Sequence, residues 1–125
     1  KIFDIGDVEV EIKPVQTLSI HKKAVCALEA NSTHVFSGSF DGTIRMWNRK
    51  SMKSSELLTG HDGGVCTMVL KENLLISGFM DIRVWDLKSM SLQRTLRWDS
   101  GGINELLVAD RKLIGAFDDS LIRVW

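Results

Sequence analysis

A short phrase ending in tryptophan recurs along this chain and limits what the chain can fold into more than any other feature of its sequence. The phrase is Ile-Arg-Met-Trp up to Trp47 and Ile-Arg-Val-Trp up to both Trp85 and Trp125, so the tryptophans recur at a nearly constant interval. A weaker copy, with Phe3 in place of the tryptophan, begins the chain. A period of about 40 residues indicates a repeat architecture.

A second series of residues has the same period. In each repeat a β-branched residue follows a His or Asp by four positions, and the pairs are His21–Val25, His61–Val65 and Asp99–Ile103. The interval from the phrase to the next His or Asp is the same after Trp47 and Trp85, but it is longer between Phe3 and His21. The first connection is therefore longer, and two series with one period predict three repeats.

Short strands are the secondary structure that each repeat predicts. In the first repeat, residues 24–28, 34–38, 44–47 and 56–58 are rich in β-branched or aromatic residues, and turn-forming residues separate them. No segment shows a helical period over about ten residues or more. Four such strands form an antiparallel meander, which cannot bury both of its faces alone. Stacked meanders arranged as radial blades are the usual solution, so we expect an all-β fold.

The same kinds of residue recur at matching positions of the first two repeats. The second repeat contains Gly60-His61, Ser77-Gly78, Asp81 and Trp85-Asp86, and the first contains His21, Ser37-Gly38, Asp41-Gly42 and Trp47-Asn48. With these motifs the chain resembles the WD-repeat β-propeller family over essentially its whole length. The resemblance implies a β-propeller of four-stranded antiparallel blades, here a partial arc of about three blades of a larger ring.

The repeats divide the chain into four segments, which are the last strands of a preceding blade (1–20), two blades (21–60 and 61–98) and an incomplete blade (99–125). Closed propellers have about four to eight blades. We therefore expect this chain to be part of a longer propeller, with the remainder of that propeller closing the ring. The alternative is that two copies close it, a strand over 15–20 of one copy completing the third blade of the other.

The resemblance also implies a buried, hydrogen-bonded tetrad of His, Ser, Asp and Trp in each blade. The tetrads would be His21, Ser37, Asp41 and Trp47 in the first blade and His61, Ser77, Asp81 and Trp85 in the second. Such a chain can form because Trp donates, Ser and His both donate and accept, and an ionised Asp only accepts. Asp81 precedes its tryptophan by four residues instead of six, which leaves open whether it reaches His61.

The third repeat has Asp99 and Gly115 where the other two have His and Ser, so we expect its blade to depend on packing instead of a tetrad. His, Ser and Asp together are also the residues of a hydrolase triad. An active site would be needed once, however, whereas these residues recur. We therefore interpret them as structural and expect no catalytic residue and no enzyme activity.

A partner-binding rim is implied as well, formed by the loop before the first strand of each blade and the turn between its second and third strands. The rim residues would be Lys22 and Phe40 in the first blade, Asp62 and Met80 in the second, and Ser100 and Asp118 in the third. Phe40 and Met80 directly precede the turn aspartate, where an apolar side chain has little core to enter. They are candidate partner contacts, or else each folds back on its neighbouring loop.

Charge and composition narrow the choice of function. Lys and Arg number 16, and Asp and Glu also number 16, so no net charge attracts nucleic acid or an acidic membrane. The basic clusters at 22–23 and 49–53 are expected at opposite ends of a blade and so form no continuous stripe for nucleic acid. No apolar run reaches the roughly 18 residues that a membrane span requires.

The cysteines bear on localisation and on metal binding. Two cysteines are too few for a disulfide scaffold and fit a reducing, intracellular compartment, cytoplasmic or nuclear. Cys26 and Cys66 occupy equivalent positions without metal-ligand spacing, and we expect both to be small buried residues. We expect no metal, cofactor or small-molecule substrate.

The function that the sequence predicts is that of a protein-interaction scaffold, a rigid platform that binds protein or peptide partners at its rim. In this family such platforms serve in substrate recognition for ubiquitin ligases or in the targeting of kinases, which are the uses that the resemblance implies. Two alternatives stay open. One is a propeller enzyme that acts in the central channel, and the other is a propeller that binds nucleic acid or lipid, whose association would depend steeply on salt.

Overall fold

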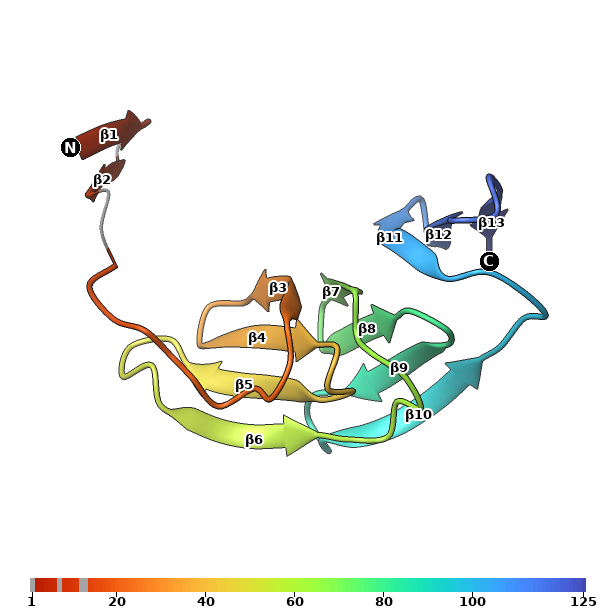
Figure 1. Ribbon diagram of the computed structural model, residues 1–125, viewed down its shortest axis with the longest axis horizontal. Helices are drawn as coiled ribbons and strands as arrows, with labels where there is room; N and C mark the ends of the chain where they lie inside the picture. The colour runs from red at the N-terminus through yellow and green to blue at the C-terminus, as the bar shows by residue number, and fades with distance from the viewer. Residues whose placement is uncertain (1, 7, 12–13) are drawn as a thin grey trace.

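The computed structural model describes the backbone of residues 2–6, 8–11 and 14–125, and the side chains of residues 14–125. In this part of the chain every element of regular structure is a β-strand (Figure 1). In chain order the strands are β1 (Ile2–Ile5), β2 (Val8–Glu11), β3 (Val25–Ala30), β4 (His34–Ser39), β5 (Ile44–Asn48), β6 (Ser54–Leu58), β7 (Thr67–Lys71), β8 (Leu74–Gly78), β9 (Ile82–Asp86), β10 (Ser91–Leu96), β11 (Ile103–Ala109), β12 (Lys112–Phe117) and β13 (Ile122–Val124).

Antiparallel sheets form between strands that are neighbours in the sequence. β1 and β2 form a hairpin, β3 to β6 and β7 to β10 each form a four-stranded meander, and β11 to β13 form a three-stranded meander. We call the three meanders the first, second and third blade. They follow an open arc, with β3, β7 and β11 on its concave side (Figure 1). β7 contacts both β3 and β11, so the innermost strands join successive blades.

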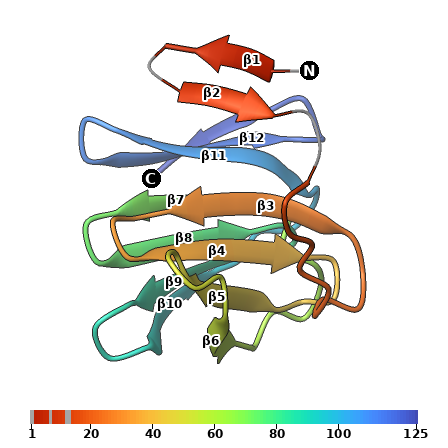
Figure 2. The same ribbon diagram turned by 90° about the vertical axis from the view of Figure 1, so that its left-hand side faces the viewer.

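The all-β fold and its antiparallel four-stranded sheets are confirmed, and the strands expected in the first blade are observed as β3 to β6. In a single copy no strand forms over 15–20, so its pairing with a second copy stays a prediction. Residues 14–24 form no strand, and Val15 is 93% exposed. In both views this segment runs past the first blade without joining its sheet (Figures 1 and 2). A strand needs a neighbour to bond its backbone groups, and the described sheets give it none. The side chain of Phe3, in the weaker copy of the phrase, lies outside the described residues.

The hydrophobic core lies between the blades rather than within them. One cluster joins the first blade to the second and includes Phe36 and Ile44 on one side and Val65 and Leu75 on the other. A second cluster joins the second blade to the third, and its buried members are Ile76, Ile82, Ile103, Leu106 and Phe117. Full burial of one such side chain stabilises the fold by about 1.5–3 kcal/mol.

Residues at equivalent positions of different blades show how much side-chain burial comes from the stacking of one blade on the next. The isoleucine that begins the third strand of a blade is fully buried at Ile44 and Ile82, where another blade follows, but 73% exposed at Ile122. Likewise Val65 is fully buried, whereas its equivalent Val25 is 50% exposed. Each face of a blade therefore supplies one half of an interface, and the sequence repeats because each interface needs the same two halves.

Candidate functional site

Four side chains of the first blade are joined by hydrogen bonds. Nε1 of Trp47 donates to Oγ of Ser37 at 2.9 Å. The Ser37 hydroxyl lies 2.7 Å from Nε2 of His21, and Nδ1 of His21 lies 3.0 Å from Oδ2 of Asp41. An ionised carboxylate only accepts, so Nδ1 donates to Asp41 and, in the neutral imidazole, Nε2 accepts from the serine. Every polar side-chain group of this tetrad then has a hydrogen-bond partner.

The second blade contains the same arrangement. Nε1 of Trp85 donates to Oγ of Ser77 at 2.8 Å, and the Ser77 hydroxyl lies 2.7 Å from Nε2 of His61. Nδ1 of His61 lies 2.7 Å from Oδ1 of Asp81, so the aspartate reaches the histidine despite its shorter turn. The pKa of His61 is lowered because burial disfavours the charged ring. The nearby Asp81 carboxylate acts in the opposite direction, but its effect is smaller. The lowered pKa favours the neutral ring that these hydrogen bonds require.

The two-residue deletion in the second blade is confined to the turn. The strand pairing next to the turn is the same in both blades, Gly38 with Ile44 and Gly78 with Ile82. Because side chains alternate between the two faces of a strand, an unchanged register keeps every residue of the tetrad on its face.

The aspartates of the two tetrads have additional donors, which differ between the blades. Burial alone would raise the pKa of Asp41, but hydrogen bonds from the Thr43 hydroxyl and the Lys22 backbone N–H hold it well below its ordinary value. The deletion removes the equivalent of Thr43 from the second blade. There, Nε of Arg83 donates to Oδ2 of Asp81 at 3.1 Å.

Aromatic packing takes the place of a tetrad in the third blade. Asp99, at the position of the histidine, is exposed. The rings of Trp98 and Phe117 meet edge to face with their centroids 5.0 Å apart, and Trp125 lies beside both. A Cβ on Gly115, at the position of the serine, would lie 3.0 Å from the Phe117 ring. The missing side chain thus makes room for the aromatic cluster, and Trp98 is a member that the sequence did not indicate.

The turns that carry the aspartates leave the preceding residue at the surface. Phe40 is 41% exposed and Met80 is 55% exposed. The other four residues expected at the rim are exposed as well, namely Lys22, Asp62, Ser100 and Asp118. The tetrads hold these turns, since Asp41 and Asp81 directly follow Phe40 and Met80.

Backbone hydrogen bonds make the rim continuous from blade to blade. The N–H of Val65 donates to the carbonyl of Ser39, and the N–H of Ile103 donates to the carbonyl of Phe79, both at 2.8 Å. Each bond joins the start of one blade to the turn of the blade before it.

Two rim aromatics lie on glycines of the following blade. A Cβ on Gly64 would come within 2.5 Å of the Phe40 ring, and a Cβ on Gly102 would come within 2.9 Å of the Phe79 ring. The two rings meet edge to face with their centroids 5.8 Å apart. Met80 follows Phe79 in the turn, and together Phe40, Phe79 and Met80 form what we call the apolar strip. Phe40 therefore both packs on its neighbour and stays exposed.

Phe79 is a rim residue that the sequence comparison of the repeats missed. Its equivalent in the first blade is Ser39, which is fully buried. The Ser39 hydroxyl donates a hydrogen bond to the Lys23 carbonyl. The comparison of the repeats aligns Phe79 with this serine and therefore did not indicate an aromatic rim residue. The one signal in the sequence is Gly102, because only a residue without Cβ leaves space for the Phe79 ring.

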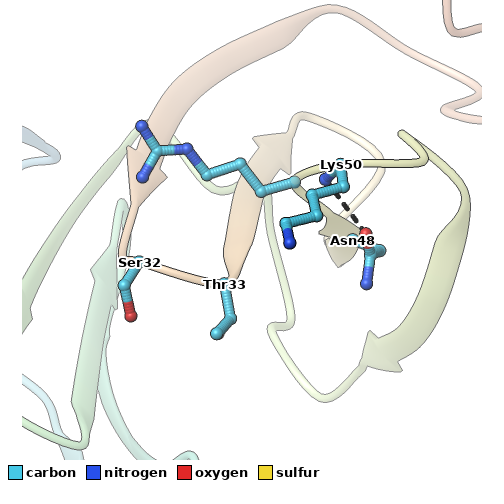
Figure 3. A pocket seen from close by; sticks show the side chains of 5 residues that line it. Ser32, Thr33, Asn48 and Lys50 are labelled. Atoms are coloured by element: carbon cyan, nitrogen blue, oxygen red, sulfur yellow. Dashed lines mark hydrogen bonds between the residues drawn. The ribbon is translucent and has the colours of Figure 1, made fainter.

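A pocket of about 490 Å³ lies at the other end of the first blade, lined by Ser32, Thr33, Asn48, Arg49 and Lys50 (Figure 3). Asn48 accepts a hydrogen bond from the backbone N–H of Lys50, and the backbone N–H of Arg49 donates to the Thr33 carbonyl. This basic cluster lies beside the turn between β3 and β4, whereas Lys22 is hydrogen-bonded to the Asp41 turn between β4 and β5. The two basic clusters are at opposite ends of the blade.

The cysteines line a smaller pocket of about 190 Å³ between β3 and β7, together with Glu29 and Glu105. The expectation that both are buried is wrong for Cys26, which is exposed, while Cys66 is half-buried. The β3–β4 register shifts between Val25 and Ala27, so Cys26 lies at a bulge that breaks the alternation of buried and exposed residues. Within the described residues, no three His, Cys, Asp or Glu side chains are grouped as metal ligands.

Residues 12–48 match the family model described as "WD domain, G-beta repeat". The fold of the chain is similar to the WD40 beta propeller domain of Doa1, with a TM-score of 0.77 and 22% identity over 85% of this chain and 38% of that one. It is also similar to U3-55K, with a TM-score of 0.76 and 22% identity over 84% of this chain and 35% of that one. The chain spans little more than a third of either structure.

These likenesses confirm the WD-repeat β-propeller fold, present here as a partial open arc. None of the described segments is a helix that could cross a membrane.

Proposed function

We propose that this WD-repeat chain is a rigid platform whose apolar strip binds a segment of a partner protein or peptide. The observation that carries the proposal is the exposure of Phe40 and Met80 on turns that are fixed by the two tetrads. Exposed apolar side chains surrounded by polar ones are typical of interaction sites.

Rigidity makes these side chains suitable anchors. The Phe40 ring is held against Gly64 and against the edge of Phe79, so it loses little conformational freedom when a partner covers it. Aromatic residues in such fixed positions contribute a large share of the binding energy at protein interfaces. Such a platform would serve in substrate recognition for a ubiquitin ligase or in the targeting of a kinase, in a reducing compartment of the cell such as the cytoplasm or nucleus.

Further blades, from the remainder of a propeller or from a second copy, would cover the exposed outer faces of the arc. Leu28 is 68% exposed on the first blade and Ile122 is 73% exposed on the third. The equivalent residues of the second blade, Met68 and Ile82, are buried by the neighbouring blades.

The experiment that tests the platform compares three forms of the chain as baits in affinity capture from a cell lysate. They are the wild type, Phe40→Ala/Met80→Ala, and the control Leu57→Ala/Leu92→Ala. The control residues are 43% and 41% exposed, and they lie on the outer strands β6 and β10. We expect the wild type and the control to retain the same partners and the rim variant to lose them. Equal capture by all three, with equal melting temperatures, would show that the apolar strip is not the binding site.

A further inference from the structure

The first blade gives the rim a positive end. Lys22 and Lys23 are exposed next to Phe40, whose backbone N–H donates to the Ala24 carbonyl. Among the described residues no carboxylate lies within ion-pair distance of either lysine. The Asp41 side chain is 10% exposed and faces His21, so its charge is turned away from the surface.

The second blade has its rim charges in pairs. Oδ2 of Asp62 lies 3.5 Å from Nη2 of Arg97 and 3.8 Å from Nη2 of Arg83. The buried Asp81 carboxylate is bound by Arg83 and His61. The middle of the rim therefore has no uncompensated charge, and it is here that Phe79 and Met80 lie.

The third blade gives the rim a negative end. Asp99 and Asp118 are exposed, and within the described part of the chain neither has a basic side chain at ion-pair distance. Oδ1 of Asp118 accepts a hydrogen bond from the backbone N–H of Gly102, which fixes the carboxylate without neutralising it. Asp119 differs, because Nη2 of Arg123 lies 2.7 Å from its Oδ2.

Contacts along the rim place these three regions in order. Phe40 of the first blade touches Gly64 of the second, and Phe79 of the second touches Gly102 of the third, where Asp118 is bound. From the first blade to the third, the rim is therefore positive, then apolar, then negative.

We propose that the partner of this rim is an extended peptide segment with an acidic end, an apolar middle and a basic end. The acidic end would lie over Lys22 and Lys23, the apolar middle over the apolar strip, and the basic end over Asp99 and Asp118. The inference rests on the proposed function, since it specifies the chemistry of what the same rim binds. Charge complementarity of this kind sets orientation and excludes partners of the wrong sign.

The test uses fluorescein-labelled peptides that share the central sequence Gly-Leu-Trp-Leu-Gly and differ in their flanks. One has glutamates before the centre and arginines after it, one has glutamates on both sides, and one has arginines on both sides. Binding to the 125-residue chain is measured by fluorescence anisotropy at low salt. We expect the mixed-charge peptide to bind about five-fold more tightly than either of the others, as two exposed ion pairs would provide.

Two charge variants of the protein test the same charge order from the side of the rim. Lys22→Glu/Lys23→Glu makes both ends of the rim acidic, and the all-arginine peptide should then bind most tightly. Asp99→Lys/Asp118→Asn makes the third blade positive and keeps an acceptor for the Gly102 N–H, and the all-glutamate peptide should then be preferred. Unchanged melting of both variants confirms that folding is intact.

The outcomes separate this inference from the proposed function. If all peptides bind equally and Phe40→Ala/Met80→Ala abolishes binding, the rim is a binding site and the charge order is wrong. If the mixed-charge peptide does not bind at all, the charge order is overturned, and the lysate experiment decides on the platform separately.

Discussion

Arg83 donates a hydrogen bond from Nε to the Asp81 carboxylate at 3.1 Å, and with it the second blade replaces a donor that it has lost. In the first blade the corresponding donor is the hydroxyl of Thr43, which the two-residue deletion removes from the second. An arginine stands two residues before the tryptophan in all three blades, and its role differs in each. Nε of Arg45, the equivalent in the first blade, is buried without a hydrogen-bond partner among the described residues.

We expect Arg83→Met to lower the free energy of unfolding by about 1.5–3 kcal/mol, because it removes a charged donor from the buried Asp81 carboxylate. Arg45→Met should change it little, since the apolar side chain removes a buried group that has no partner. Urea unfolding of the two variants measures the difference. Equal losses would contradict the replacement of Thr43 by Arg83.

Ser77→Ala tests the tetrad of the second blade. It leaves both Nε1 of Trp85 and Nε2 of His61 without a partner, so we expect a loss of about 1–3 kcal/mol in the free energy of unfolding. Ser55→Ala on the exposed outer strand is the matched control and should cost little. A Ser77→Ala variant as stable as the control would show that the hydrogen-bonded chain does not contribute to stability.

The stability of the chain should decrease as the pH falls below about 6.5, the ordinary pKa of histidine. Burial lowers the pKa of His61 in the folded state, so below this pH the unfolded chain binds more protons and acid favours unfolding. Asp41, whose folded pKa is also lowered, adds a further loss below about 3.8. Chemical unfolding at a series of pH values follows the effect, and His61→Gln should flatten the slope near pH 6. An unchanged slope in that variant would assign the effect to other groups.

Gly64→Ala should displace the Phe40 ring and weaken partner binding. The added Cβ would lie 2.5 Å from the ring and 3.0 Å from Cα of Phe40, so the ring must move. Gly63→Ala is the control, since its Cβ would meet Met80 at an ordinary 3.7 Å. Neither glycine has a positive φ, so backbone strain does not distinguish them. Capture of the same partners by both variants would argue against Phe40 as an anchor.

The two cysteines should differ in reactivity. Cys26 is exposed, whereas burial and the neighbouring Cys26 sulfur raise the pKa of the Cys66 thiol, which leaves less of the reactive thiolate. Brief treatment with iodoacetamide followed by mass spectrometry should find Cys26 modified first. Faster modification of Cys66 would contradict its partial burial.

The sequence predicted those features of the fold that depend on period. The recurring tryptophans, and the residues four positions after each His or Asp, define the blades, because every interface between blades needs the same side chains. It could not show that Asp81 reaches His61, which depends on how the shortened turn runs between strands of unchanged register.

The repeat pattern could not predict local irregularities either. The bulge that exposes Cys26 leaves no mark in the alternation of the sequence. Phe79 occupies a position that is a buried serine in the first blade, and its half-buried position at the rim depends on Gly102, which belongs to the next blade.

The seating of Phe40 on Gly64, and of Phe79 on Gly102, has an evolutionary consequence. What a repeat presents at the surface is determined partly by its own sequence and partly by the repeat that comes after it. Duplicating, exchanging or deleting a single repeat would alter the surface at both of its borders, so the specificity of the proposed binding site would belong to the junction between two repeats.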